Sequence, residues 1–231
     1  MRTLITTYLM LLLCGFTANA QSCSMGFAHR IKGCHSRNVA IAMAQYAEQY
    51  LYTTGSEGYD EDSFIEVLHA MIESPLLTDA DKQRPTALLK SVMKNRPGQV
   101  AADISFITPN NKQHHLHECE TPFTILLFND PECEDCAEIK QQISSNSILQ
   151  RLIDDKKLTV VGIYPYDDEA QWRATKYPDN MINGWDRDMT IEETESYVIP
   201  QIPTLYLLGE KQKVILKNTT LKEIISYFER Q

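Results

Sequence analysis

The chain has 231 residues, of which 43% are hydrophobic and 23% charged, and its formal net charge is −9 at pH 7. This length predicts either one elaborated domain or one domain with a smaller neighbour, and the hydrophobic share is enough for a core of ordinary size. The acidic balance, without a basic patch or an arginine-rich segment, argues against nucleic acid as a partner.

The N-terminus is typical of a secretory signal peptide over residues 1–20. Arg2 gives a basic start, residues 9–16 form an apolar run too short to span a membrane, and Ala18-Asn19-Ala20 fits a small-x-small cleavage site. We therefore expect an exported, periplasmic protein with no spanning membrane segment after cleavage. The alternative is a lipid anchor in the cell envelope, attached at Cys14 or Cys23.

Export changes how the cysteines are interpreted, because disulfides persist outside the cytosol. Loss of Cys14 with the signal leaves five cysteines, at positions 23, 34, 119, 133 and 136. An odd number leaves at least one thiol free or paired between chains. Cys23 and Cys34 are candidates for a structural disulfide that closes a small loop.

Residues 21–96 are predicted to form a helical N-terminal region, with its helices over residues 36–95. One helical face is indicated by apolar residues at i, i+3, i+4, i+7 and i+8, which are Phe64, Val67, Leu68, Met71 and Ile72. Thr78 and Asp81 resemble a capping box that starts another helix. Asn95-Arg96-Pro97-Gly98 marks a domain boundary. We interpret the apolar stripes as packing surfaces and attach no activity to this region.

Strands and helices alternate over residues 97–231. A hairpin is expected around a turn at 109–111, and the apolar runs at 123–128 and 158–164 are typical of strands buried on both faces. The polar stretch 165–196 is predicted to be irregular and anchored by Trp172 and Trp185. Two more strands, at 204–208 and 214–216, precede an amphipathic helix over 221–228.

This order of elements resembles the thioredoxin fold, with a CxxC motif, Cys133 to Cys136, where the first buried strand turns into its helix. Tyr-Val-Ile-Pro-Gln-Ile-Pro-Thr at 197–204 is similar to the segment that thioredoxins carry opposite the active site. There an apolar residue precedes a cis-proline, and Ile202 and Pro203 take these positions as substrate-positioning residues.

Residues 97–119 resemble the N-terminal hairpin of the TlpA/ResA-like branch of exported bacterial thioredoxins. The expected fold is therefore α/β and thioredoxin-like, with a central mixed sheet flanked by helices, joined to a small all-helical N-terminal region.

In that fold the two cysteines suit thiol–disulfide exchange. The thiolate is the attacking species, and a helix N-terminus favours a thiolate. The resemblance makes Cys133 the exposed attacking sulfur and Cys136, nearly one turn inward, the resolving sulfur. Glu134 and Asp135 place negative charge beside Cys133 and disfavour its thiolate. We therefore expect a low reduction potential and a reductant rather than a strong oxidant.

The sequence departs from its relatives around the motif. Glu132 stands where tryptophan commonly precedes the first cysteine, and Leu127 stands where thioredoxins bury an aspartate as a proton acceptor. Ile139 replaces a glutamate found in some cytochrome-maturation relatives. Resolution by Cys136 thus lacks an obvious buried base, and either water or Glu138 is left for that role.

The resemblance implies a thiol–disulfide oxidoreductase that acts on protein disulfides without a cofactor or metal, and that needs a membrane electron donor if it reduces them. One alternative is a zinc site in which the motif is joined by potential ligands of the hairpin, namely His114, His115, His117 and Cys119. Others are a structural disulfide and a non-catalytic binding module on a thioredoxin scaffold. A peroxiredoxin is disfavoured, because residues 130–132 lack the threonine expected before its reactive cysteine.

Overall fold

The structure, a computed structural model, describes the backbone of residues 20–231 and the side chains from Gly26 onward. The predicted signal peptide, apart from Ala20, and the side chains of Cys14 and Cys23 lie outside the described residues. The chain divides into two compact units, one ending at Val92 and the other beginning at Met93. No described helix is long and apolar enough to cross a membrane.

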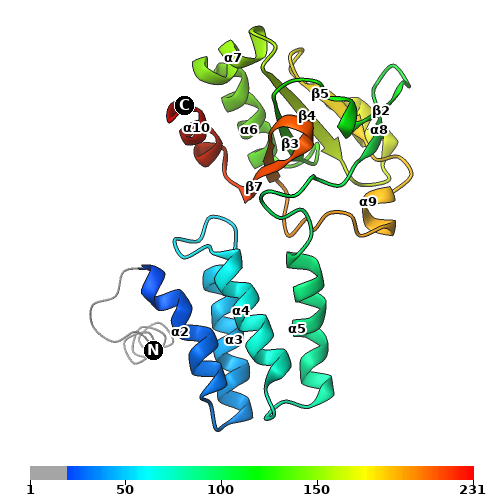
Figure 1. The fold of residues 1–231 in the computed structure, drawn as a ribbon. Helices are drawn as coiled ribbons and strands as arrows, with labels where there is room; N and C mark the ends of the chain where they lie inside the picture. The colour runs from blue at the N-terminus through cyan, green and yellow to red at the C-terminus, as the bar shows by residue number, and fades with distance from the viewer. Residues whose placement is uncertain (1–19) are drawn as a thin grey trace. The chain divides into compact units, whose positions relative to one another are not determined.

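The first unit is helical over its described residues, as the apolar stripes predict (Figure 1). Its helices are α2 (Ala20–Lys32), α3 (Arg37–Leu51), α4 (Glu61–Glu73) and α5 (Asp79–Val92). Helix α4 packs against the other three, and the predicted stripe from Phe64 to Met71 is buried in the core. The Asp60 carboxylate caps α4 by accepting a hydrogen bond from the Ser63 N–H at 3.1 Å.

Helix α2 was not expected, since the predicted helices began near residue 36. Its apolar stripe is only Phe27, Ala28 and Ile31, too short to stand out as a periodic pattern. All three side chains are buried in the core of the unit, so tertiary packing stabilises a helix with a weak local signal.

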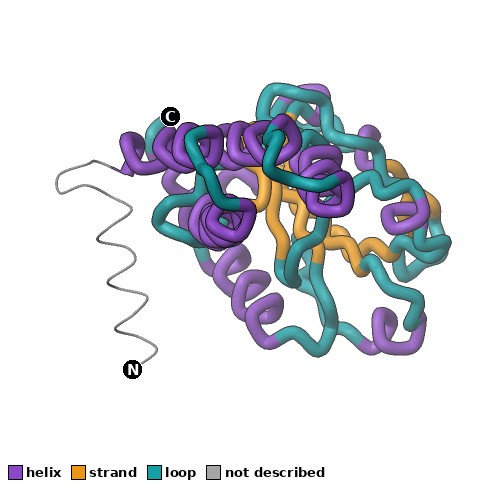
Figure 2. The backbone as a smooth tube through the Cα atoms, turned by 90° about the horizontal axis from the view of Figure 1, so that it is seen from below, coloured by secondary structure: helices purple, strands orange, loops and turns teal. Residues whose placement is uncertain are grey.

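The second unit contains a seven-stranded mixed sheet, which Figure 2 shows in orange among the helices. The strand order is β2-β1-β5-β4-β3-β6-β7. The strands are β1 (Ser105–Ile107), β2 (Gln113–His115), β3 (Phe123–Phe128), β4 (Leu158–Tyr164), β5 (Ile182–Trp185), β6 (Thr204–Leu208) and β7 (Val214–Thr219). Strand β3 pairs in parallel with β4 and antiparallel with β6.

The helices of this unit are α6 (Glu134–Ser145), α7 (Ser147–Asp154), α8 (Glu169–Ala174), α9 (Thr190–Glu193) and α10 (Leu221–Glu229), with short 3₁₀ turns at Leu116–Glu118 and Glu210–Gln212. Side chains of β3 alternate between two cores, as a strand covered on both faces requires. Ile125 and Leu127 pack with α6, α7 and α10, whereas Leu126 and Phe128 pack with residues from 101–116 and 191–202.

The prediction for residues 165–196 was wrong. This stretch contains α8, α9 and a sheet strand, β5, which lies between β4 and β1. The strand is short and its sequence, Ile-Asn-Gly-Trp, mixes polar and apolar residues, so no periodic signal marks it. Trp172 and Trp185 are buried as predicted, with ring centroids 5.2 Å apart.

Gly162 in β4 is a position where the fold has no room for a side chain. A Cβ there would lie 2.0 Å from the Tyr177 hydroxyl oxygen and 2.7 Å from the ring carbon that bears it. The absence of a side chain on this central strand therefore lets Tyr177 cover it.

Replacing Gly162 by alanine is expected to lower the free energy of unfolding by roughly 1–3 kcal/mol, the usual cost of overpacking a filled core. Chemical denaturation measures the change. In a Tyr177→Ala background, which removes the opposing ring, the same replacement should cost much less. An equal cost in both backgrounds would show that the ring does not set the constraint.

Candidate functional site

The CxxC motif lies between the end of β3 and the start of α6. Cys133 is the N-cap residue of α6, and its Sγ accepts a hydrogen bond from the Cys136 N–H at 3.1 Å. The two cysteines form a disulfide, with their Cα atoms 5.2 Å apart. Cys133 is partly exposed, whereas Cys136 is fully buried. The two sulfurs therefore differ in access as the sequence predicted, and the outer one lies at the helix N-terminus.

The loop before the motif is held by hydrogen bonds to the backbone of the sheet. Buried Asn129 donates a side-chain hydrogen bond to the Ile163 carbonyl of β4 at 3.1 Å. Asp130 accepts from the Glu132 N–H at 2.8 Å through its carboxylate, and from the Cys133 N–H at 3.3 Å through its carbonyl. These bonds fix the point at which Cys133 leaves the sheet.

The acidic residues flank the outer sulfur as predicted. Glu134 and Asp135 form the first turn of α6, and their side chains are exposed, as is that of Glu132. Their negative charges offset the partial positive charge of the helix N-terminus, the feature that would otherwise favour a Cys133 thiolate. Because these carboxylates face water, salt screens their effect.

Pro203 lies at the matching end of the neighbouring strand. The Ile202–Pro203 peptide bond is cis. In the antiparallel pair of β3 and β6, Thr204 is the register partner of Phe128, so Ile202 and Pro203 lead into β6 where β3 gives way to the motif loop. The two predicted substrate-positioning residues thus lie at the same end of the sheet as the cysteines. A direct contact between Pro203 and Cys133 stays a prediction.

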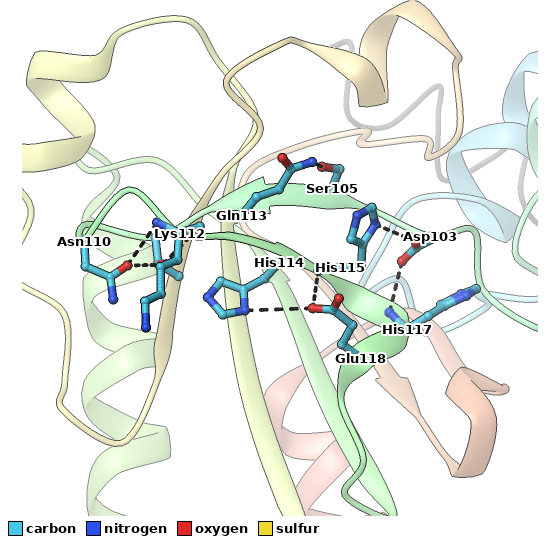
Figure 3. A network of polar contacts seen from close by, with 10 residues as sticks. Asp103, Ser105, Asn110, Lys112, Gln113, His114, His115, His117 and Glu118 are labelled. Carbon is cyan, nitrogen blue, oxygen red and sulfur yellow. Dashed lines mark hydrogen bonds and ion pairs between the residues drawn. The ribbon is translucent and has the colours of Figure 1, made fainter.

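The histidine-rich hairpin does not form the alternative zinc site. Figure 3 shows its side chains bonded within the hairpin: His115 Nδ1 lies 2.9 Å from an Asp103 carboxylate oxygen, and His114 Nδ1 lies 3.9 Å from Glu118. His117 Nε2 lies 2.8 Å from the Ala101 carbonyl oxygen. Among the described residues, no three His, Cys, Asp or Glu side chains are arranged to hold a metal ion.

The other described cysteines, Cys119 and Cys34, form no disulfide. Cys119 is half-buried and free, and burial, aided by the negative charge of Glu118, raises the pKa of its thiol to about 11. It is therefore protonated and unreactive at neutral pH. Cys34 is also free in the structure, and its Sγ lies 3.8 Å from the Met43 sulfur. The predicted pairing with Cys23 involves a side chain outside the described set.

The strand pairing shows that the buried aspartate of thioredoxins, their proton acceptor, has no counterpart at position 127. Leu127 is fully buried and is the register partner of Gly162 in β4 and of Leu205 in β6, so no carboxyl group lies there. Glu138, a candidate base, is exposed on α6.

Sequence reasoning missed Lys140, which is 6% exposed on the buried face of α6. Its place in the stripe with Cys136, Ile139 and Ile143 was the available signal.

Comparison with known proteins agrees with this fold. A family described as "Domain of unknown function (DUF5106)" matches residues 5–95. No curated protein matches the sequence. A thioredoxin-like protein from Bacteroides caccae ATCC 43185 is 31% identical with a TM-score of 0.86, over 92% of this chain and 78% of its own.

Two other solved structures match the second unit in size. The C-terminal domain of an uncharacterized protein from Bacteroides fragilis NCTC 9343 is 28% identical with a TM-score of 0.57, over 58% of this chain and 98% of its own. The thioredoxin domain of a thiol-disulfide oxidoreductase from Bacteroides vulgatus is 19% identical with a TM-score of 0.50, over 58% of this chain and 96% of its own. The latter shows a shared fold, and the extent and identity of the Bacteroides caccae match show that this chain belongs to the thioredoxin-like proteins.

Proposed function

We propose that this protein is an exported thiol–disulfide oxidoreductase that reduces or exchanges disulfides of other proteins through Cys133 and Cys136. The observation that carries the proposal is the asymmetry of the pair: two cysteines at disulfide distance, one partly exposed at a helix N-terminus and the other fully buried. A purely structural disulfide has no need of this arrangement.

The reaction divides between the two sulfurs. The Cys133 thiolate attacks one sulfur of a substrate disulfide, which forms a mixed disulfide and releases the other substrate sulfur as a thiolate. Cys136 then loses its proton and attacks Cys133, which leaves the intramolecular disulfide and frees the second substrate thiolate. Two electrons pass from the dithiol to the substrate. A membrane electron donor would restore the dithiol, because the cycle ends with an oxidised protein.

The direction we propose is reduction, on electrostatic grounds. Carboxylates at positions 132, 134 and 135 make the Cys133 thiolate less stable than the helix N-terminus alone would, and so disfavour the reduced form. The sequence pattern at residues 1–20 supports the proposed export, with the periplasm or a lipid-anchored position in the cell envelope as the place of action. A non-catalytic binding module on the same scaffold is the second candidate, and would leave the disulfide inert.

The central test is reduction of a protein disulfide by the reduced protein. The wild type should reduce it, Cys133→Ser should lose all exchange, and Cys136→Ser should accumulate a mixed disulfide because the resolving sulfur is missing. Gel analysis without reductant detects that adduct. Cys119→Ser is the matched control and should keep full activity. Activity in Cys133→Ser equal to that of an active wild type would exclude the proposed chemistry, and a wild type that reduces no disulfide would favour the binding module.

Alkylation should separate the roles of the sulfurs. In the reduced protein at neutral pH and limiting reagent, Cys133 should be labelled first, because it is partly exposed while Cys136 is buried. Cys119 should resist labelling until the pH approaches its raised pKa of about 11. Peptide mapping by mass spectrometry reads out the sites, and preferential labelling of Cys136 would reverse the assigned roles.

Charge removal tests the proposed direction. Replacing Glu134 by Gln and Asp135 by Asn should make the pair more oxidising by tens of millivolts, since about 1.4 kcal/mol corresponds to roughly 30 mV in a two-electron couple. The kinetic pKa of Cys133 should fall as well. Redox titration against glutathione measures the shift, which should shrink in high salt. An unchanged or more reducing potential at low salt would leave the reductant direction unsupported.

A further inference from the structure

A groove opens beside the motif, on the side of α6 that faces α8. It has a volume of about 1140 Å³. Pro131 and Glu132 of the motif loop and Ala137 of α6 line it, together with Asp168 and Gln171 at α8. Because the residues next to Cys133 form one of its walls, a molecule bound to the outer cysteine has this groove within reach.

Lys140 lines the groove, and its side chain packs into the groove wall. The residue is 6% exposed, and its ammonium lies 4.5 Å from the centre of the Tyr177 ring. No described side chain forms an ion pair or hydrogen bond with its ammonium, although the charge of Asp130 acts on it. Burial lowers the pKa of this amine, which is the cost of holding a charge out of water.

Tyr177 cannot neutralise this charge. Burial raises the pKa of its phenol well above the usual range, so the ring is neutral and offers only a cation–π contact. The Nζ atom of Lys140 is not sealed from solvent, so the three N–H donors of the ammonium are accessible from the groove. The groove therefore presents a partly desolvated positive group that suits an anionic ligand.

We propose that Lys140 and this groove form a subsite for a carboxylate carried by the disulfide substrate, close in sequence to the substrate cysteine that reacts with Cys133. The proposal rests on the proposed function and narrows its substrate class to acidic segments. Charge complementarity selects the anion, because the least exposed charged residue of the groove, Lys140, is positive. Its carboxylates, Glu132 and Asp168, have exposed side chains and are screened by solvent.

The geometry of α6 sets the distance between Cys133 and Lys140, and so the spacing of the groups in the substrate. Seven positions of α6 separate Cys133 from Lys140, which places their Cα atoms about 10 Å apart along the helix axis. Three residues of extended peptide span about 10 Å. Helical side chains also lean toward the helix N-terminus, here toward Cys136 and Ala137, which shortens the distance to be bridged. The favoured substrate carries its carboxylate about three residues from its cysteine.

Two synthetic peptides test the subsite. Each is a symmetrical disulfide of a blocked peptide with one cysteine, and the residue three positions away is glutamate in one and glutamine in the other. Reduced wild-type protein should reduce the glutamate peptide about tenfold faster, since a charge-assisted hydrogen bond to a buried partner is worth at least this factor. Equal rate constants in the wild type would overturn the subsite.

Lys140→Met removes the ammonium while keeping an unbranched stem against Tyr177, and should reduce both peptides at the same rate. Lys222→Met, which removes an exposed lysine from α10, is the matched control for net charge and should keep the tenfold preference. A preference that survives in Lys140→Met would assign it to another group. If Lys140→Met fails to fold, Lys140→Gln takes its place. The comparison of the two peptides with the wild-type protein still tests the subsite.

Binding measured without disulfide exchange distinguishes the carboxylate subsite from the proposed oxidoreductase activity. Peptides with serine in place of cysteine cannot exchange, and calorimetric titration should give an about tenfold lower Kd for the glutamate version with the wild type alone. Wild-type protein that reduces neither disulfide peptide but keeps this preference would refute the oxidoreductase and support the subsite. Protein that reduces both disulfides equally and binds both serine peptides equally would refute the subsite alone.

Discussion

The burial of strand β3 is the constraint on which the site depends. The strand is hydrogen-bonded on both edges, to β4 and β6, and covered on both faces by separate cores. A strand held on four sides has one register, because a shift of one residue would exchange its two apolar sets between cores. Its last residue, Phe128, is therefore fixed in space, and so is the start of the loop that leads to Cys133.

Opposing electrostatic effects meet at the first turn of α6. The helix N-terminus and the Cys136 N–H favour negative charge on the Cys133 sulfur. The carboxylates of Glu134 and Asp135 oppose it, yet the same acidic residues stabilise the start of the helix. The residues that make the helix easy to begin thus also weaken its activating effect on the thiol.

The interior beside the motif combines strand residues without ionisable groups and a lysine on the inner face of α6. The register partners Leu127 and Gly162 carry no ionisable group, and Tyr177 fills the space above Gly162. The one charged side chain that α6 buries against this layer is Lys140, whose ammonium lies over the same tyrosine ring. Gly162, Tyr177 and Lys140 are therefore linked: a side chain at 162 would displace the ring that the lysine packs on.

Local patterns determined much of this protein. The buried strands, the first-turn position of the acidic pair and the helical character of the N-terminal unit follow from hydrophobic periodicity and capping residues, and the family resemblance of residues 97–231 located the cysteines and Pro203. Tertiary structure decided the rest. Strand β5 exists because β4 and β1 offer it hydrogen-bonding edges, and helix α2 because neighbouring helices bury its short stripe. Lys140 shares the helical stripe of Cys136, Ile139 and Ile143, but the burial of its side chain depends on the packing of α6 against Tyr177.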